Sequence, residues 1–328
     1  MKRILLLLAL WGAAAQAQPA ASPDAAPVPV PVPDSAPASV PRPPRDVHGV
    51  DMRTQAGPPG ARYSPPFPLD PKLPNFWLIG DSTMRNGSGG DGMNLNQWGW
   101  GAPLTFYFDP QKVNVVNRAL GGTSARSFYN NNWKKMVDLI RPGDVVIMQF
   151  GTNDGGVPTK SVGDLPGIGE EMQAITNRAG QPETIHTYGW YLRQMIAETR
   201  AKQATPIVCS LIPRKVWDAD GRIKRTMDTF EGWAGQVARQ QGVGFIDLNE
   251  LIGRVYDKMS RAQVDLIYVP NPTPDKPRGE TVHPGWEGAV INAEVVVSGL
   301  KALADDPVAA YFSAKGRAIA PASSSPAP

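Results

Sequence analysis

Five short apolar runs, separated by longer amphipathic stretches, constrain the fold of this chain more than any other feature. The runs have the length of strands buried on both faces of a sheet. They cover residues 76–79, 113–116, 145–150, 206–212 and 243–248. Helical patterns cover residues 132–140, 184–202, 226–241, 248–259 and 286–304. This alternation predicts an α/β fold in which a parallel sheet carries helices on both faces.

The first 17 residues have the pattern of a secretory signal. Lys2 and Arg3 precede an apolar stretch at 4–11, and Ala15-Gln16-Ala17 has the form of a cleavage site. The apolar stretch is too short to span a bilayer, so no membrane span is expected. We therefore expect export to the periplasm or beyond.

Pro- and Ala-rich segments flank the region that can build a core. Residues 18–73 cannot bury enough apolar surface to offset their ordering entropy, so we expect a disordered tether. Residues 313–328 repeat this composition more weakly and predict a disordered tail. The folded domain should then span residues 74–312, and we expect it to be a monomer.

Charge and cysteine content exclude several classes of protein. Without Lys2 and Arg3, the 33 basic residues become 31, against 30 acidic ones, and no basic stripe suggests nucleic acid. The single cysteine, Cys209, allows no internal disulfide and is expected to be a small buried residue. No Cys/His cluster suggests a metal, and we expect no cofactor.

Candidate chemistry gathers where the predicted strands end. Ser82 follows Gly80 at the end of the first strand, at the sheet edge where open α/β folds bind ligands. Gly-rich segments at 117–127 and 149–156 follow the second and third strands, and their backbone N–H groups suit a developing oxyanion. The alternatives are a helix-capping serine and two ordinary turns.

The supply of histidine limits the choice of a general base. The chain has three histidines. His48 lies in the predicted tether, His186 lies in the first turn of a predicted helix, and His283 follows Glu280 by three residues. A serine, a base and an orienting acid are what acyl transfer needs. The alternative for His283 is a surface histidine with no catalytic role.

Four motifs together resemble a known family. "GDST", "GGTSARSF", "FGTND" and "ETVHPGWEGA" occur in the order and approximate spacing of the four blocks of the SGNH (GDSL-like) hydrolases. Their flanks are similar to those of the rhamnogalacturonan acetylesterase branch, and the resemblance covers about residues 74–303. It implies a three-layer α/β/α sandwich around a five-stranded parallel sheet, similar to flavodoxin.

The resemblance also implies roles for individual residues. Ser82 would be the nucleophile, and His283 the general base that Glu280 orients. The backbone N–H groups of Ser82 and Gly122 and the side-chain amide of Asn153 would form the oxyanion hole.

Two positions depart from the family pattern. Glu280 stands where the family usually has Asp, which leaves Asp275 and Asp247 open as alternative partners of His283. Thr152 replaces a His that is frequent in the third block, which could alter the support of the oxyanion hole.

Substrate contacts are less constrained. Arg126 and Arg85 could meet an acidic polysaccharide or could be structural, and His186 could line the cleft or cap a helix. Five aromatic residues could stack on sugars or pack in the core: Trp98, Trp100, Trp133, Trp190 and Tyr188.

The predicted function is a carbohydrate O-acetylesterase acting on acetylated pectic rhamnogalacturonan. The alternatives are an esterase of the same family acting on xylan, peptidoglycan or small acyl esters, and a non-catalytic sugar-binding protein on the same fold.

Overall fold

The structure is a computed structural model that describes residues 70–85, 97–226, 229–269 and 280–323. The predicted signal at 1–17, His48 and nearly all of the predicted tether lie outside the described residues, as does Asp275. Those expectations stay predictions.

A five-stranded parallel sheet forms the centre of the domain, which confirms the predicted fold class. The strand order is β2-β1-β3-β6-β7, and every neighbouring pair is parallel. The strands are β1 (Asn75–Gly80), β2 (Asn114–Asn117), β3 (Val145–Gln149), β6 (Thr205–Cys209) and β7 (Gly244–Ile246). Each strand lies inside its predicted apolar run or extends beyond it by a single residue. Cys209 is buried, as predicted.

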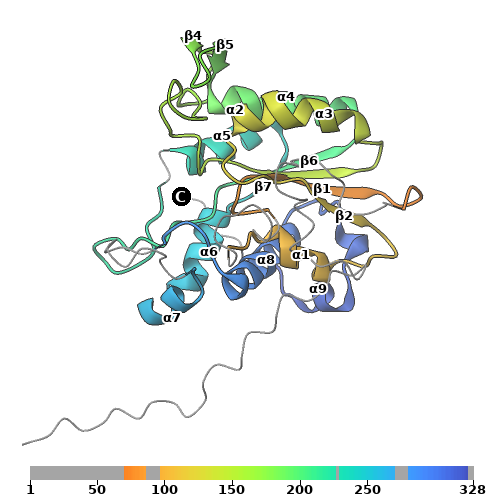
Figure 1. Cartoon of the computed structure of the whole chain (residues 1–328). Coiled ribbons are helices and arrows are strands. Elements are labelled where there is room, and N and C mark those ends of the chain that lie inside the picture. Colours follow the sequence, from red (N-terminus) through yellow and green to blue (C-terminus); the bar gives the residue numbers. More distant parts are fainter. Residues whose placement is uncertain (1–69, 86–96, 227–228, 270–279, 324–328) are drawn as a thin grey trace, which may run out of the picture. The chain divides into compact units, whose positions relative to one another are not determined.

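Helices cover both faces of this sheet (Figure 1). The longer ones are α4 (Tyr188–Ala201), α5 (Phe230–Gln241), α6 (Leu248–Tyr256) and α8 (Trp286–Leu300). Alternate residues of β1 serve different cores: Phe76 and Leu78 pack with residues of α6 and α8, whereas Trp77 and Ile79 pack with residues of α4 and α5. Burial on both faces explains why β1 is apolar without alternation.

Shorter helical segments complete the domain. They are α1 (Gly101–Leu104), η2 (Thr105–Tyr107), α2 (Ala125–Phe128), η3 (Tyr129–Trp133), α3 (Lys134–Met136), η4 (Val137–Leu139), α7 (Arg261–Leu266), η5 (Ala309–Tyr311) and α9 (Ala314–Ala318). The single helix predicted over 132–140 is therefore a chain of short helical pieces. In the described part of the chain, no helix has the length and apolar character to cross a membrane.

A two-stranded hairpin was missed by the sequence analysis. β4 (Met172–Thr176) pairs antiparallel with β5 (Pro182–His186), and most of its residues are exposed. Because neither strand buries a face, no alternating apolar pattern marks them. The helix predicted from residue 184 begins instead at Tyr188, where the hydroxyl of Thr187 accepts a hydrogen bond from the N–H of Trp190. His186 consequently ends a strand.

The start of the predicted tail is also wrong. Ser313 caps α9 through a hydrogen bond from the N–H of Gly316, and its own N–H donates to the carbonyl of Tyr107. Farther along, the N–H of Ala322 donates to the carbonyl of Ser298. Small residues permit these close approaches: a Cβ on Gly316 would lie 2.1 Å from the carbonyl oxygen of Tyr107. The folded part therefore continues beyond residue 312.

We expect a chain ending at residue 312 to be less stable than one ending at residue 323. The shorter chain loses α9 and the partners of the Lys301 ammonium, which donates to the carbonyls of Gly316 and Arg317. Loss of several such bonds should lower the melting temperature by several degrees. Thermal unfolding of the two chains compares them directly, and equal melting temperatures would show that α9 adds no stability.

Candidate active site

Ser82 lies just beyond the carboxyl end of β1. Gly80 is the last paired residue of β1 and stands opposite Gln149, the last residue of β3. A side chain at position 80 would collide with the neighbouring strand, since a Cβ there would lie 2.6 Å from the carbonyl oxygen of Gln149. This parallel register brings the loop containing Ser82 beside the loop that follows β3. Ser82 itself is partly exposed.

His283 and Glu280 come from the segment that precedes α8, and they form a line with Ser82. The Oγ of Ser82 lies 2.9 Å from the Nε2 of His283. On the other side of the ring, Nδ1 lies 3.3 Å from Oε2 of Glu280. The two atoms lie within ion-pair distance, but their angles do not meet the geometry of a hydrogen bond. The order nucleophile, base and acid is the one that activates a serine.

The loop around Glu280 holds its carboxylate in place. Oε1 accepts hydrogen bonds from the backbone N–H groups of Val282, at 2.7 Å, and of His283, at 3.2 Å. Burial opposes ionisation of this carboxyl, but the hydrogen bonds and the charge of His283 prevail and lower its pKa to about 2. Glu280 therefore remains a charged partner for the imidazole well into the acid range.

Asp247 makes structural hydrogen bonds, and none of those within the described residues involves His283. Its Oδ1 accepts from the hydroxyl of Ser210 at 2.9 Å and from the N–H of Glu250 at 3.1 Å, and it caps α6. Of the two alternatives to Glu280, Asp247 thus has a structural position, whereas Asp275 lies outside the described residues.

Three hydrogen-bond donors are available beside Ser82. Among the described residues, neither the N–H of Ser82 nor that of Gly122 has an intramolecular acceptor. Gly122 has φ of +75°, a conformation that favours glycine. The amide Nδ2 of Asn153 donates to the carbonyl of Thr123 at 2.9 Å, which fixes the side chain and leaves its second N–H for a ligand. These groups suit an oxyanion hole.

A buried carboxylate ties the two donor loops together. Oδ1 of Asp154 accepts from the N–H of Ala125 at 2.7 Å, and Oδ2 accepts from the N–H of Gly151 at 2.8 Å. Ala125 follows Gly122 by three residues, and Gly151 precedes Asn153 by two. Asp154 therefore positions both loops without facing the substrate. The sequence analysis gave it no role.

A second acid, Asp164, lies against Asp154. Burial raises the pKa of Asp154 to about 6, against the hydrogen bonds that it accepts. Burial and then the charge of Asp154 raise the pKa of Asp164 well above its ordinary range. Two buried carboxyl groups this close cannot both ionise cheaply, so Asp164 holds a proton that Asp154 shares.

A polar network also supports the Ser82 turn from below. Asp81 accepts from the N–H and the hydroxyl of Thr83, both at 2.8 Å. The Gln149 amide donates to that hydroxyl and accepts from Nε1 of Trp100 at 2.6 Å. Burial raises the pKa of Asp81, and the hydrogen bonds from Thr83 oppose this rise. The buried hydroxyl of Thr152 lies near Asp81, at the position where the family frequently has His.

Several predicted substrate contacts are wrong. Trp100, Trp133 and Tyr188 are fully buried, and Trp98 is nearly so, which leaves none of these rings a face for a sugar. Arg126 is 4% exposed and donates to the carbonyl of Ser161 at 3.1 Å. Its guanidinium also lies 3.5 Å from Glu183, so it joins α2 to β5.

The other two predicted contacts are Arg85 and His186. Arg85 is buried, and its guanidinium packs against Gly121. His186 stacks on Trp190 with the ring centroids 3.9 Å apart and the planes at 12°. Both of these rings are partly exposed, but the ring and hydrogen-bond contacts of the described residues do not link them to Ser82, His283 or Glu280.

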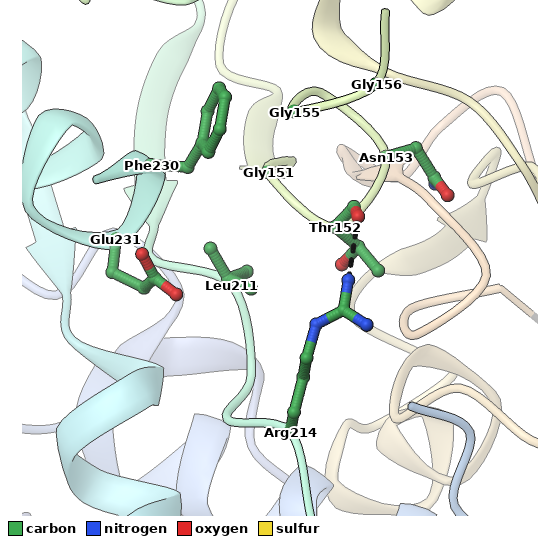
Figure 2. Close-up of a pocket in the computed structure, with 9 residues that line it drawn as sticks. All are labelled: Gly151, Thr152, Asn153, Gly155, Gly156, Leu211, Arg214, Phe230 and Glu231. Carbon is green, nitrogen blue, oxygen red and sulfur yellow. Dashed lines mark hydrogen bonds between the residues drawn. The ribbon is translucent and has the colours of Figure 1, made fainter. Parts of the chain in front are cut away.

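A cavity of about 510 Å³ adjoins the oxyanion loop (Figure 2). The loop after β3 forms one wall, and the segment after β6 and the start of α5 form the others. The lining residues are Gly151, Thr152, Asn153, Gly155, Gly156, Leu211, Arg214, Phe230 and Glu231. Arg214 was not predicted from the sequence, although it follows the fourth predicted strand. Residues that follow the carboxyl ends of strands in open α/β sheets commonly bind ligands.

We expect Glu280→Gln to lower kcat roughly a hundredfold or more, because an amide cannot stabilise the protonated imidazole. Asp247→Asn is the matched control and should stay within a few-fold of the parent. Steady-state kinetics with p-nitrophenyl acetate measure both variants. If Glu280→Gln keeps near-parent turnover, another acid orients His283, and Asp275→Asn becomes the variant to examine.

The Asp154–Asp164 pair should make stability depend on pH. A carboxyl whose pKa is raised by folding stabilises the folded state at low pH and loses that contribution as the pH rises through the folded pKa. Denaturant unfolding should show the parent losing stability as the pH rises from about 4, the ordinary carboxyl pKa, to about 6, the folded pKa of Asp154, and the raised pKa of Asp164 extends this decline to higher pH. Asp164→Asn imitates the protonated acid and should flatten this decline.

Asp154→Asn is the contrasting variant. Its amide nitrogen must face one of two backbone N–H donors, so we expect a loss of about 1–3 kcal/mol in the free energy of unfolding. Activity should fall as well, because the donor loops loosen.

A decline in stability with pH that is unchanged in Asp164→Asn would show that the pair does not share a proton.

Comparison with known proteins agrees with this geometry. Residues 78–291, more than half of the chain, match the GDSL-like Lipase/Acylhydrolase family. A rhamnogalacturonan acetylesterase of Emericella nidulans is 29% identical over 211 residues, covering 63% of this chain and 80% of that protein. The probable rhamnogalacturonan acetylesterase YesY of Bacillus subtilis is 29% identical over 177 residues, covering 54% and 70%.

A solved structure shares the fold. The crystal structure of the YxiM protein of Bacillus subtilis superposes with a TM-score of 0.55 at 25% identity, and the match covers 70% of this chain and 56% of that one. The match to the family spans β1 to α8 and includes Ser82, Gly122, Asn153, Glu280 and His283. The chain belongs to the GDSL-like lipase/acylhydrolase family and is a carboxylic ester hydrolase.

Proposed function

We propose that this enzyme is a carbohydrate O-acetylesterase that removes acetyl groups from pectic rhamnogalacturonan. The observation that carries the proposal is the line Ser82–His283–Glu280, with hydrogen-bond donors available at the N–H groups of Ser82 and Gly122 and the second N–H of the Asn153 amide. The names of the two acetylesterase relatives support the choice of substrate.

The first half of the reaction forms an acetyl-enzyme. His283 Nε2 takes the proton of the Ser82 hydroxyl as its oxygen attacks the acetyl carbonyl carbon. The carbonyl oxygen becomes an oxyanion that Ser82, Gly122 and Asn153 receive; loss of one such donor costs roughly 3–4 kcal/mol of barrier. The C–O bond to the sugar breaks, and His283 returns the proton to the departing sugar oxygen.

The second half repeats the sequence with water. His283 takes a proton from a water molecule, whose oxygen attacks the acetyl-serine carbonyl. The same donors receive the oxyanion, and the Ser82 oxygen leaves with the proton held by His283. The products are acetate and the free enzyme. Glu280 stabilises the imidazolium that forms in each half.

Export and a monomeric state belong to the same proposal. Export rests on the signal-like sequence of residues 1–17, and the monomeric state is proposed alongside it. A polysaccharide outside the cell is a substrate that an exported enzyme can reach.

Acetate release from a panel of acetylated substrates tests the proposed function. We expect the highest kcat/KM on acetylated rhamnogalacturonan and lower values on acetylated xylan, acetylated peptidoglycan and p-nitrophenyl acetate. Ser82→Ala should lower kcat by at least about a thousandfold on every substrate while the fold is retained.

A higher kcat/KM on xylan or peptidoglycan would overturn the pectic substrate but not the esterase. A parent protein that binds the polysaccharide and hydrolyses none of these esters would instead be the sugar-binding alternative.

A further inference from the structure

The cavity next to the oxyanion loop is larger than an acetyl group needs. Its volume of about 510 Å³ lies within the range of small-molecule pockets, roughly 300–1,000 Å³. Asn153, a predicted oxyanion donor, and Thr152 form one of its walls (Figure 2). A substrate group bound there would lie close to Asn153 and therefore close to the acetyl ester.

One end of this cavity carries a cation. Arg214 is exposed, and one of its guanidinium nitrogens donates to the carbonyl of Thr152 at 3.2 Å. This bond uses one of five N–H donors and anchors the guanidinium at the rim. Among the described residues, no carboxylate lies within ion-pair distance of Arg214. Arg126 and Arg85, the cations expected from the sequence, are buried and engaged elsewhere.

The opposite wall of the cavity carries an acid instead of a cation. The Glu231 carboxylate is 8% exposed, and its two oxygens accept hydrogen bonds from the hydroxyls of Thr226 and Thr229. Phe230 and Leu211 add apolar surface to the cavity, and Leu211 lies between Glu231 and Arg214 (Figure 2). A negative ligand group is therefore repelled at the Glu231 end and attracted at the Arg214 end, while a sugar ring can lie on the ring of Phe230.

We propose that this cavity binds a uronate unit of the polysaccharide, either the acetylated sugar itself or one close to it, and that Arg214 recognises the uronate carboxylate. The guanidinium fork matches a carboxylate in bidentate geometry, which an ammonium group cannot reproduce. This inference rests on the proposed function, because it names the part of an acidic polysaccharide that the enzyme reads. It makes Arg214 a specificity-determining residue outside the triad.

The test compares two substrates that differ only in charge: an acetylated rhamnogalacturonan oligosaccharide, and the same oligosaccharide with its uronate carboxyl groups reduced to alcohols. For the parent, carboxyl reduction should lower kcat/KM about tenfold or more, mainly by raising KM. For Arg214→Ala, the two substrates should give nearly equal kcat/KM. Arg214→Lys should retain part of the discrimination.

Arg222→Ala is the matched control, because Arg222 is an exposed arginine that does not line the cavity. It should discriminate between the substrates as the parent does. If Arg214→Ala still favours the charged substrate by the parental factor, the inference is overturned and the proposed function stands. If the parent hydrolyses p-nitrophenyl acetate but releases acetate from neither oligosaccharide, the proposed function fails and the inference fails with it.

Discussion

The parallel register between β1 and β3 is the constraint on which the site depends. It sets Gly80 opposite Gln149, so that Ser82 and the loop from Gly151 to Asn153 leave the sheet at the same edge. β2 pairs with the other side of β1, and the N–H of Leu120 donates to the carbonyl of Gly80, which brings Gly122 to the same place. The nucleophile and the oxyanion donors therefore meet through backbone geometry, and His283 reaches them from the segment before α8.

Buried acids hold the donor loops that the register brings together. Asp154 accepts one N–H from each donor loop, so a movement of either loop breaks a hydrogen bond inside the protein. Burying a carboxylate is costly, and the proton shared with Asp164 reduces that cost. We interpret the pair as a support that exchanges some stability at high pH for a fixed oxyanion hole.

The sheet, and the segments that carry Ser82, Asn153 and His283, were predictable because their signals are local. Each buried strand is a short apolar run, and Ser82, Asn153 and His283 lie inside motifs that follow those runs or precede the last long helix. The exposed strands β4 and β5 bury no face and leave no such signal. The partnership of Asp154 with Asp164, and the burial of Arg126 and Trp100, depend on how separate segments pack. Arg214 follows a predicted strand, so its place near the sheet edge was predictable. The sequence did not show that Glu183 would pair with Arg126 while no carboxylate of the described residues pairs with Arg214.

The central claim is that Ser82 is activated by His283 in this arrangement, and covalent trapping tests it most directly. The protein is treated with a serine-reactive phosphonate ester, and the adduct is located by mass spectrometry of the intact protein and its peptides. The account predicts one adduct per chain, on Ser82, formed far more slowly in His283→Ala, whose nucleophile has lost its base. An adduct on another residue, or equally fast labelling of Ser82 in His283→Ala, would contradict it.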